Sequence, residues 1–354
     1  MPANAPELIA LLDRLTAATP AASATPTNAA APANAAAGKP SAPVAVIGSM
    51  NADYTVVTER LPRPGETVTA GPLRVLPGGK SGNQAASAAR LGADVRMFGA
   101  VGSDANADFL LGELGKAGVD TCNVLRAQGA SGTTVITVDA HGENTIVYSP
   151  GSNALVSADY VVSRRDALAG ARVLGLCLES PIDTVTAAAR LCHDAGVTVL
   201  LNNSPFVPAH DLPADLVAAT DILLVNEHEM AMMLDVEEPA NGRWIAFDWQ
   251  EALAGMAALG FPRAIVTLGA EGSVVLDADS GVASHIDPVT VDAVDTTGCG
   301  DAFMGTVLAG LAAGFDLRDA VRLASAVSAY AATGQGAQAS YGSADRIRDW
   351  LVAR

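Results

Sequence analysis

Short, uninterrupted apolar runs alternate with stretches of helical periodicity over most of this chain. Strands that are apolar along their whole length are buried on both faces, as they are in parallel sheets covered by helices. The pattern therefore predicts an α/β fold: a doubly wound, mostly parallel sheet with helices on both faces. The expected strands are 44–47 (VAVI), 95–101, 173–178, 197–201, 221–225 and 264–268, and the expected helices are 81–91, 104–117, 183–195, 249–259, 317–332 and 343–353.

A second kind of strand is inserted into this pattern. Residues 54–58, 67–76 and 133–149 alternate between apolar and polar side chains, and the HGEN stretch (141–144) reads as a hairpin turn. Alternation is typical of a sheet with one exposed face. We therefore expect a small β-sheet lid over a cleft, with strands from about 54–76 and 122–150.

The first 43 residues differ from the rest. From Ala17 to Pro43 the chain is rich in Ala and Pro and has almost no charge, which predicts a disordered tail over residues 1–43 before a folded domain at 44–354. The alternative is a docking helix at Glu7–Leu15.

Charge and composition exclude several classes of protein. The formal net charge is −17, and Arg164–Arg165 is the only adjacent basic pair, so no nucleic-acid or anionic-membrane partner is expected. No apolar run reaches the ~18–20 residues of a membrane span. The N-terminus lacks the features of a secretion signal, which predicts a cytoplasmic protein. The four cysteines are far apart, which disfavours disulfides and zinc.

The most informative motif is DTTGCGDAF at 295–303. Glycines before a helix expose backbone N–H groups, and a helix start attracts anions, so Gly298, Cys299 and Gly300 resemble an anion cradle. Asp301 beside such a cradle suits phosphoryl transfer, in which the acid accepts a proton from an attacking hydroxyl. An ordinary helix cap is an equally good interpretation of these nine residues alone.

A second glycine turn, PGGKSGNQ at 77–84, also leads into a helix. It is not a Walker A loop, because the lysine directly follows the glycine pair. Gly79 lets a ligand approach the backbone, and Lys80 and Asn83 offer donors and an acceptor suited to sugar hydroxyls. A capped helix with a surface lysine is the alternative.

Further polar residues follow strands, where open α/β sheets bind ligands. Asn51 and Asp53 follow the first strand, and Glu179 follows the third. Asn226 and Glu229, three residues apart, suit Mg²⁺ through water. TLGAEG (267–272) could pass a nucleotide across its glycines. Taken alone, Asn51 and Asp53 also suit a turn, and TLGAEG also suits a turn between strands. A surface acid at Glu179 and a helix cap with solvated acids at 226–229 would be the preferred interpretations of those two motifs taken alone.

Taken in order, these motifs resemble the ribokinase family of sugar and nucleoside kinases, most closely its ribokinases. The resemblance covers about Val44 to Leu351 and rests on GSMNAD (48–53), PGGKSGNQA (77–85), LES (178–180), NEHE (226–229), TLGAEG, AVDTTGCGD (293–301) and GAQAS (336–340). It implies an ATP-dependent kinase that phosphorylates the primary hydroxyl of a pentose, D-ribose first among them, with ATP, Mg²⁺ and K⁺ as cofactors.

The resemblance also implies roles for single residues. Asp301 matches the catalytic base, and Gly298, Cys299 and Gly300 match the anion hole. The implied pentose-binding residues are Asn51, Asp53, Gly79, Lys80, Asn83 and Glu179, together with Asp301. The implied nucleotide-binding residues are Asn226, Glu229, Thr267, Gly269, Gly272 and Gly300, with Glu229 reaching Mg²⁺ through water. The implied potassium site comprises Asp295, Thr297, Ala331, Gly336 and Ser340. A homodimer formed through the lid is a further implication.

This chain departs from the family pattern at two positions. Ser81 stands where the family usually has Gly, and Cys299 replaces a common Ala. A thiol at a helix N-terminus is expected to have a lowered pKa, which would make Cys299 sensitive to oxidation. Inert packing of this thiol is the preferred alternative. The segment 237–250 is longer than a minimal loop and holds two of the three tryptophans.

Other functions stay open at this point. The substrate could be deoxyribose, adenosine, another nucleoside or fructose, although Tyr54 and Tyr148 are the only lid aromatics available to cover a base. A catalytically silent sugar-binding regulator would not need the acid at Asp301. A dinucleotide-dependent oxidoreductase would carry GxGxxG after the first strand, where GSMNAD stands instead.

Overall fold

The computed structural model describes residues 5–18 and 43–354 and is built around one large sheet. Its strands are β1 (Val44–Ile47), β4 (Val95–Val101), β5 (Val124–Arg126), β8 (Val173–Cys177), β9 (Thr198–Asn202), β10 (Ile222–Asn226), β11 (Arg263–Thr267), β12 (Ser273–Asp277) and β13 (Val282–Ile286). The spatial order is β13-β12-β11-β10-β9-β8-β1-β4-β5, and only β12 and β13 run antiparallel to their neighbours. The predicted doubly wound, mostly parallel sheet is confirmed.

Helices cover both faces of this sheet, which explains the continuous apolar runs. In β1, Val44 and Val46 contact one hydrophobic core, while Ala45 and Ile47 contact the other. The first core is covered by α1 (Ala5–Ala18), α2 (Lys80–Arg90), α3 (Ala105–Ala117), α10 (Cys299–Ala312), α11 (Leu317–Ala331) and α13 (Ala344–Val352). The second is covered by α4 (Ala158–Ser163), α5 (Arg165–Ala169), α6 (Ile182–Asp194), α7 (Ala214–Ala218), α8 (Glu227–Leu234) and α9 (Trp249–Ala258).

Short helices complete the described fold. A four-residue helix, α12 (Ala337–Ser340), lies between α11 and α13. The 3-10 turns are η1 (Gly151–Leu155), η2 (Ala209–Asp211), η3 (Trp244–Ala246) and η4 (Gly269–Glu271). Within residues 5–18 and 43–354, no helix is both long enough and apolar enough to cross a membrane.

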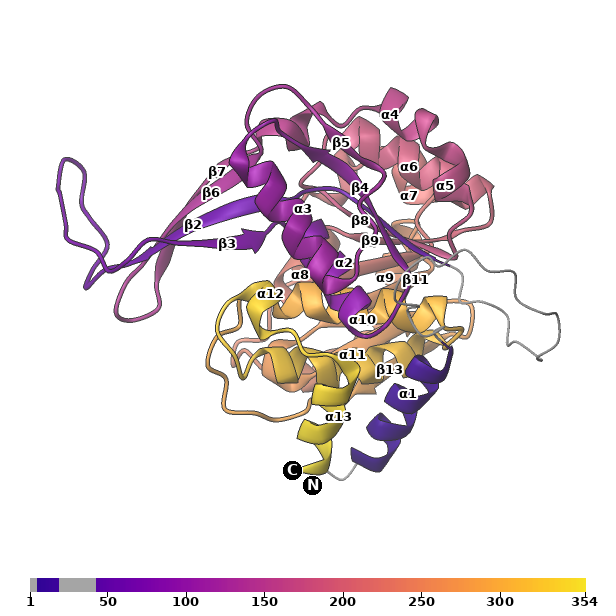
Figure 1. Ribbon diagram of the computed structural model, residues 1–354. Helices are drawn as coiled ribbons and strands as arrows, with labels where there is room; N and C mark the ends of the chain where they lie inside the picture. The colour runs from indigo at the N-terminus through magenta and orange to yellow at the C-terminus, as the bar shows by residue number, and fades with distance from the viewer. Residues whose placement is uncertain (1–4, 19–42) are drawn as a thin grey trace, which may run out of the picture.

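The small sheet extends away from the body of the molecule (Figure 1). It consists of β2 (Asn51–Val57), β3 (Arg74–Gly78), β6 (Gly132–Val138) and β7 (Asn144–Ser149), in the order β3-β2-β6-β7. Three residues of the HGEN stretch, 141–143, lie in the turn between β6 and β7, as expected, and Asn144 begins β7. The expected lid boundary at residue 122 is wrong, because β5 pairs with β4 at the edge of the large sheet.

The strand register gives this lid two different faces. Residues that pair directly across all four strands lie on one face, and the next residue of each strand lies on the other. One row is Val75, Tyr54, Val135 and Val147, and the adjacent row is Leu76, Asp53, Thr134 and Tyr148. Asp53 and Thr134 hydrogen-bond to each other at 2.5 Å, so the second row carries the polar groups.

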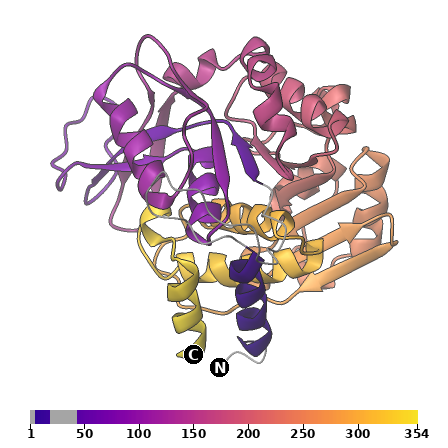
Figure 2. The same ribbon diagram turned by 45° about the vertical axis from the view of Figure 1, so that its right-hand side comes forward.

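The N-terminal helix α1 packs beside α13 and α11 (Figures 1 and 2). Leu8, Leu11, Leu12 and Leu15 form one buried stripe at helical spacing. Ion pairs join Asp13 to Arg348 and Arg14 to Asp319 at its rim. For residues 5–18 the expectation of a disordered tail is therefore wrong, and the docking helix describes them. The rest of the expected tail, residues 1–4 and 19–42, lies outside the described part of the chain.

Replacing Leu12 by Ala tests whether docking of α1 stabilises the domain. Leu12 is fully buried, so the substitution should lower the free energy of unfolding by about 2–5 kcal/mol, as measured by urea denaturation. Ala10→Gln, on the exposed side of the same helix, is the control and should change it by less than about 0.5 kcal/mol. Equal unfolding midpoints for Leu12→Ala and the wild type would show that the helix contributes nothing.

Candidate active site

The carboxyl ends of the central parallel strands meet at one edge of the large sheet, and the polar residues collect there. Asn202, Asn226 and Thr267 are the last residues of β9, β10 and β11. Helix α10 begins at the same edge after Gly298, whose φ of 77° is left-handed. The N–H of Cys299 donates to the carbonyl of Thr296 at 3.1 Å. Among the described residues, no acceptor takes the N–H of Gly298 or Gly300, and those donors are free for a ligand.

Asp301 lies in the first turn of α10 and is only 8% exposed. Its Oδ2 accepts a hydrogen bond from Asn83 Nδ2 at 2.9 Å, and its Oδ1 accepts one from Gln84 Nε2 at 3.2 Å. Burial raises the pKa of Asp301, and the charge of Lys80 and the bond from Asn83 oppose that rise. Each carboxylate oxygen retains a lone pair for a proton or a hydroxyl.

Lys80 supplies the positive charge nearest to this acid. Burial works against its charged form, but Asp301 and Glu179 outweigh burial, so the pKa of Lys80 is raised. Glu179 is fixed in turn by the hydroxyl of Ser49 and by the backbone N–H of Lys80, whose nitrogen lies 3.1 Å from Oε2. The lysine is therefore charged at neutral pH and faces the acid.

A polar cavity of about 230 Å³ joins these groups. It brings residues from the glycine turn, three strand ends and the start of α10 into one space. Its lining comprises Lys80, Asn202, Ser204, Leu224, Val225, Asn226, Glu229, Thr267, Gly298, Gly300 and Asp301. Free N–H groups, an ammonium group and a carboxylate thus surround a volume that could hold the phosphates of a ligand.

Polar side chains also gather where the lid joins the body. Asn51 Oδ1 accepts from Asn153 Nδ2 at 2.7 Å, and Asn153 also bonds both backbone groups of Met50. Burial raises the pKa of Asp53 to about 6, against a lowering contribution from its bond with Thr134, and the charges of Glu179 and Asp301 add to the rise. These amide and carboxyl groups suit a ligand rich in hydroxyls.

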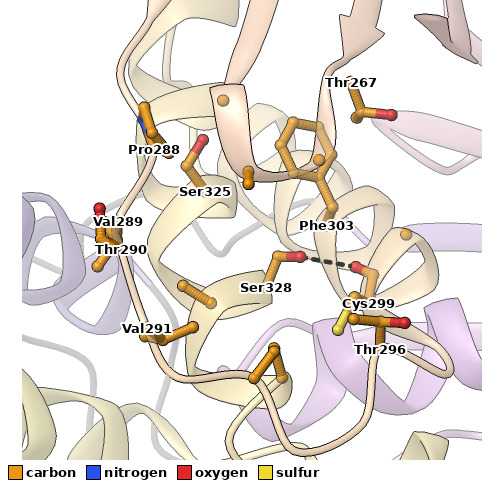
Figure 3. A pocket seen from close by; sticks show the side chains of 17 residues that line it. Thr267, Pro288, Val289, Thr290, Val291, Thr296, Cys299, Phe303, Ser325 and Ser328 are labelled. Carbon is orange, nitrogen blue, oxygen red and sulfur yellow. Dashed lines mark hydrogen bonds between the residues drawn. The ribbon is translucent and has the colours of Figure 1, made fainter. Parts of the chain in front are cut away.

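A second cavity of about 330 Å³ lies on the other side of the start of α10 (Figure 3). The extended segment Pro288–Val291 forms one wall, and α10 and α11 contribute Cys299, Phe303 and Ser328 opposite it. Ser328 Oγ donates to the carbonyl of Cys299 at 3.0 Å, which ties the two helices together. The lining is mostly apolar, and Gly300 and Thr267 border both cavities.

The residues of the expected potassium site also come together. Asp295 accepts hydrogen bonds from the backbone N–H groups of Gly336 at 2.8 Å and Thr297 at 2.9 Å. These bonds hold the pKa of Asp295 below its usual value although burial opposes them. A Cβ on Gly334 would lie 2.9 Å from the Cβ of Ser340, so the loop after Ala331 and Ser340 are in close contact. Within the described residues, no group of three His, Cys, Asp or Glu side chains could hold a metal ion.

Comparison with known proteins decides the family. The sequence model of the pfkB family carbohydrate kinases matches residues 41–343. The chain is a pfkB family carbohydrate kinase. It is 31% identical over 300 residues to a ribokinase of Staphylococcus aureus, covering 84% of this chain and 95% of that protein. It is 31% identical over 310 residues to a deoxyribokinase of Salmonella typhi, covering 87% of this chain and 98% of that protein.

Solved structures agree with this assignment. The Arabidopsis thaliana ribokinase complexed with ribose and ATP matches with a TM-score of 0.78 and 28% identity, over 87% of this chain and 98% of that chain. This carbohydrate kinase is thus a phosphotransferase with an alcohol group as acceptor. The family match begins at residue 41, so helix α1 lies outside it.

The predicted site residues of the kinase lie along one continuous region. Asn51, Asp53, Gly79, Lys80, Asn83 and Glu179 lie at the lid root and the glycine turn, next to Asp301. Asn226 and Glu229 line the polar cavity and also form a capping box, with Asn226 Oδ1 accepting from the Glu229 N–H at 2.8 Å. Thr267, Gly269 and Gly272 border the apolar cavity.

The lowered pKa expected for the Cys299 thiol is wrong, and the raised pKa favours the alternative of inert packing. Burial raises its pKa to about 11, and the charge of Asp295 adds to this effect, although the thiol stands at a helix N-terminus. A half-buried thiol with this raised pKa stays protonated at neutral pH. It therefore serves as part of the wall of the apolar cavity.

Several residues near the acid carry no local sequence signal. Gln84, Gln338 and Tyr341 are buried and bond to the acid, to Asn83 and to Gly298, respectively. Asn51 is singled out in the sequence because it is a polar residue that follows a strand. The same criterion would have found Asn153, which follows strand β7 in a short turn that contains glycine.

The segment 237–250 supports the turn that borders the apolar cavity. The carboxylate of Glu271, in η4, accepts the backbone N–H groups of Trp244 at 2.7 Å and Ile245 at 3.1 Å. Trp244, Phe247 and Trp249 pack on one another, with ring centroids 5.1–6.3 Å apart. The extra residues thus contact the glycine turn from outside the cavity and do not line it.

Replacing Gly298 by Ala should disrupt the start of α10. Its φ is left-handed, and an added Cβ would lie 2.5 Å from the Cβ of Ala337 and 2.6 Å from the Tyr341 hydroxyl. We expect the free energy of unfolding, measured with a denaturant, to fall by about 1–3 kcal/mol, and we expect the kinase rate to fall as well. Gly300→Ala is the matched control, because its Cβ would meet open space, and it should unfold like the wild type. Equal stability of the two variants would contradict this account.

Proposed function

We propose that this kinase transfers the γ-phosphoryl group of ATP to the primary 5-hydroxyl of a pentose, D-ribose in the first place, with Asp301 as general base. The observation that carries the proposal is the position of Asp301. Its buried carboxylate lies in one polar cavity with Lys80 and the free N–H groups of Gly298 and Gly300. The ribokinase relatives support the choice of sugar.

The reaction follows from this arrangement. Asp301 accepts the proton of the sugar hydroxyl as its oxygen bonds to the γ-phosphorus. The bond from that phosphorus to the bridging oxygen breaks, and ADP leaves. The N–H groups of Gly298 and Gly300 face the charge on the transferring group, and Lys80 adds a positive charge. Positioned base and donors of this kind typically contribute ~10²–10⁴ and ~10²–10³ in rate, respectively.

The two cavities support the binding of ATP. The larger one is mostly apolar and accepts a base and ribose, and it leads past Gly300 and Thr267 into the polar cavity that accepts the phosphates. Mg²⁺ held mainly by phosphates and water would neutralise their charge, and Glu229, which faces this cavity, would reach it through water.

We also propose that K⁺ binds between Asp295, the carbonyl oxygens of Thr297, Ala331 and Gly336, and the hydroxyl of Ser340. The hydrogen bonds of Asp295 already join the loop before α10 to the loop after α11, which gives a hard oxygen-rich set. A bound cation would order the turn that carries the free N–H groups. Equal activity in K⁺ and Na⁺ would contradict this role.

The lid supports a free sugar as substrate. Its polar row, with Asp53 and Thr134, and the buried Asn51 and Asn153 at its root offer many hydrogen bonds to hydroxyls. A site built for these contacts rejects ligands that leave them unpaired. Deoxyribose is the second candidate, because a deoxyribokinase matches this chain as well as a ribokinase does. Adenosine, fructose and a silent sugar-binding role are further alternatives.

The other face of the lid supports a homodimer. Val75, Val135 and Val147 pair in register across it and are 38%, 53% and 69% exposed. A flat apolar row of this kind is typical of a protein interface. We propose that two lids pack through this row. Val147→Asp should then halve the mass measured by light scattering, and an unchanged mass would count against the dimer.

A substrate assay tests the main proposal. ADP release is measured with ribose, deoxyribose, adenosine and fructose, for the wild type and for Asp301→Asn. We expect turnover with ribose or deoxyribose, and a loss of about 10²–10⁴ in kcat in the variant, because the amide cannot take the proton. A wild-type kcat in Asp301→Asn would contradict the role of Asp301 as general base. No turnover with any of the four compounds would favour the silent regulator.

The pKa of Asp53 predicts a pH dependence of sugar binding. With a pKa of about 6, its carboxyl group is ionised at pH 7.5 and largely protonated at pH 5, where it loses acceptor capacity. The KM for the sugar should therefore rise as the pH falls through about 6. Asp53→Asn should have a high KM that changes little over the same range. A wild-type KM that is constant from pH 7.5 to 5 would contradict the assignment.

A further inference from the structure

The segment that follows the expected potassium loop contacts two parts of the reacting machinery. It comprises helix α12 and Tyr341, and two of its side chains are almost fully buried, Gln338 and Tyr341 each being 3% exposed. Gln338 hydrogen-bonds to Asn83, which in turn holds Asp301, and Tyr341 hydrogen-bonds to Gly298 in the turn before α10. Neither side chain lines either cavity.

Gln338 fixes the orientation of the amide that holds Asp301. Gln338 Nε2 donates to Asn83 Oδ1 at 3.0 Å, and Asn83 Nδ2 donates to Asp301 Oδ2 at 2.9 Å. An ionised carboxylate only accepts, so Asn83 must present its NH₂ group to Asp301 and its oxygen to Gln338. The donor from Gln338 therefore prevents the Asn83 amide from turning over.

Tyr341 fixes the other half of the site. Its hydroxyl donates to the carbonyl of Gly298 at 2.8 Å. Burial raises the pKa of Tyr341 well above its ordinary range, so the hydroxyl stays a donor at working pH. Gly298 is left-handed and lies against Ala337 without room for a Cβ. The segment of α12 and Tyr341 therefore holds the turn that carries the free N–H groups, through a hydrogen bond and through close packing at Gly298.

The segment itself is anchored at both ends. Arg90, at the end of α2, donates from Nη1 to the carbonyls of Gln338 and Tyr341, at 2.6 Å each. The N–H of Gly336 donates to Asp295. Since α2 also carries Lys80, Asn83 and Gln84, the two helix starts and α12 form one connected polar unit.

We propose that Gln338 and Tyr341 are positioning residues for phosphoryl transfer: Gln338 acts through Asn83 on the carboxylate of Asp301, and Tyr341 acts on the anion-binding turn at Gly298. The proposal rests on the proposed kinase mechanism. It assigns to the GAQAS segment a role distinct from cation binding. One segment thus supports both the carboxylate and the turn, through contacts with Asn83 and with Gly298.

A double-mutant cycle tests the role of Gln338. Gln338→Leu keeps the size of the side chain but removes the donor, and it should lower kcat/KM about tenfold, because Asn83 can then turn away from the acid. In an Asn83→Ala background the same substitution should cost less than about twofold. Multiplicative losses in the double variant would show that Gln338 does not act through Asn83 and would overturn the proposal.

Tyr341→Phe tests the role proposed for Tyr341 at the turn of Gly298. It removes only the hydroxyl, so we expect kcat to fall about tenfold with little change in the sugar KM, since the turn acts on charge that develops in the transition state. An unchanged kcat would overturn this part. Ser87→Ala is the control for both substitutions, because the Ser87 hydroxyl also joins α2 to α10, through the carbonyl of Ala302 at 3.1 Å, but hydrogen-bonds to neither Asn83 nor Gly298. It should leave kcat and KM at wild-type values.

A titration separates this proposal from the kinase mechanism. The Asp301 carboxyl carbon, followed by NMR in the uniformly labelled protein, should titrate at higher pH in Gln338→Leu than in the wild type, because it loses the bond from Asn83. Lys80, Glu179, Asp53, Cys299 and Tyr341 face the same carboxyl and are unchanged in this comparison. The same pKa of Asp301 in Gln338→Leu and in the wild type would overturn the role proposed for Gln338. Absence of wild-type turnover with every acceptor would instead overturn the kinase mechanism, while the titration would still decide the role of Gln338.

Discussion

The site depends on the burial of one carboxylate between two helix starts. A buried acid is costly unless charge and hydrogen bonds compensate it. The start of α2 supplies Lys80, Asn83 and Gln84, so α2 must lie directly against α10. Gly305 permits this approach, because a Cβ there would lie 2.4 Å from the carbonyl of Gln84. Packing of these helices and ionisation of Asp301 are therefore parts of the same constraint.

Features encoded locally could be predicted from the sequence. Strands such as β1 and β8 are buried on both faces, so their residues are apolar throughout, and their order along the chain indicates a parallel sheet. The alternation of apolar and polar residues in β6 and β7 predicts the lid, because a sheet with one exposed face needs polar side chains on that face. The glycine turns before α2 and α10 predict two helix starts, because the positive φ of Gly79 and Gly298 favours glycine and is therefore visible in the sequence.

Features that depend on distant partners could not be predicted. Gln338 meets Asn83 across 255 residues, and nothing in GAQAS indicates a buried donor. Helix α1 has an apolar stripe of ordinary strength, and its leucines are buried by packing against α11 and α13, at the other end of the chain. The raised pKa of Cys299 has the same origin, since its main cause is burial by neighbouring elements that the local sequence does not reveal.

The lid root shows how the site determines the sequence around it. A Cβ on Gly132 would lie 2.1 Å from Asn153 Nδ2 and 2.4 Å from Asn51 Oδ1, and one on Gly78 would lie 1.9 Å from Asp53 Oδ2. Neither glycine has a left-handed φ, so the backbone conformation does not require glycine there. The polar side chains occupy the space in which a side chain would stand. Glycine at the base of β6 and at the end of β3 is therefore imposed by the hydrogen-bonding groups of Asn51, Asp53 and Asn153.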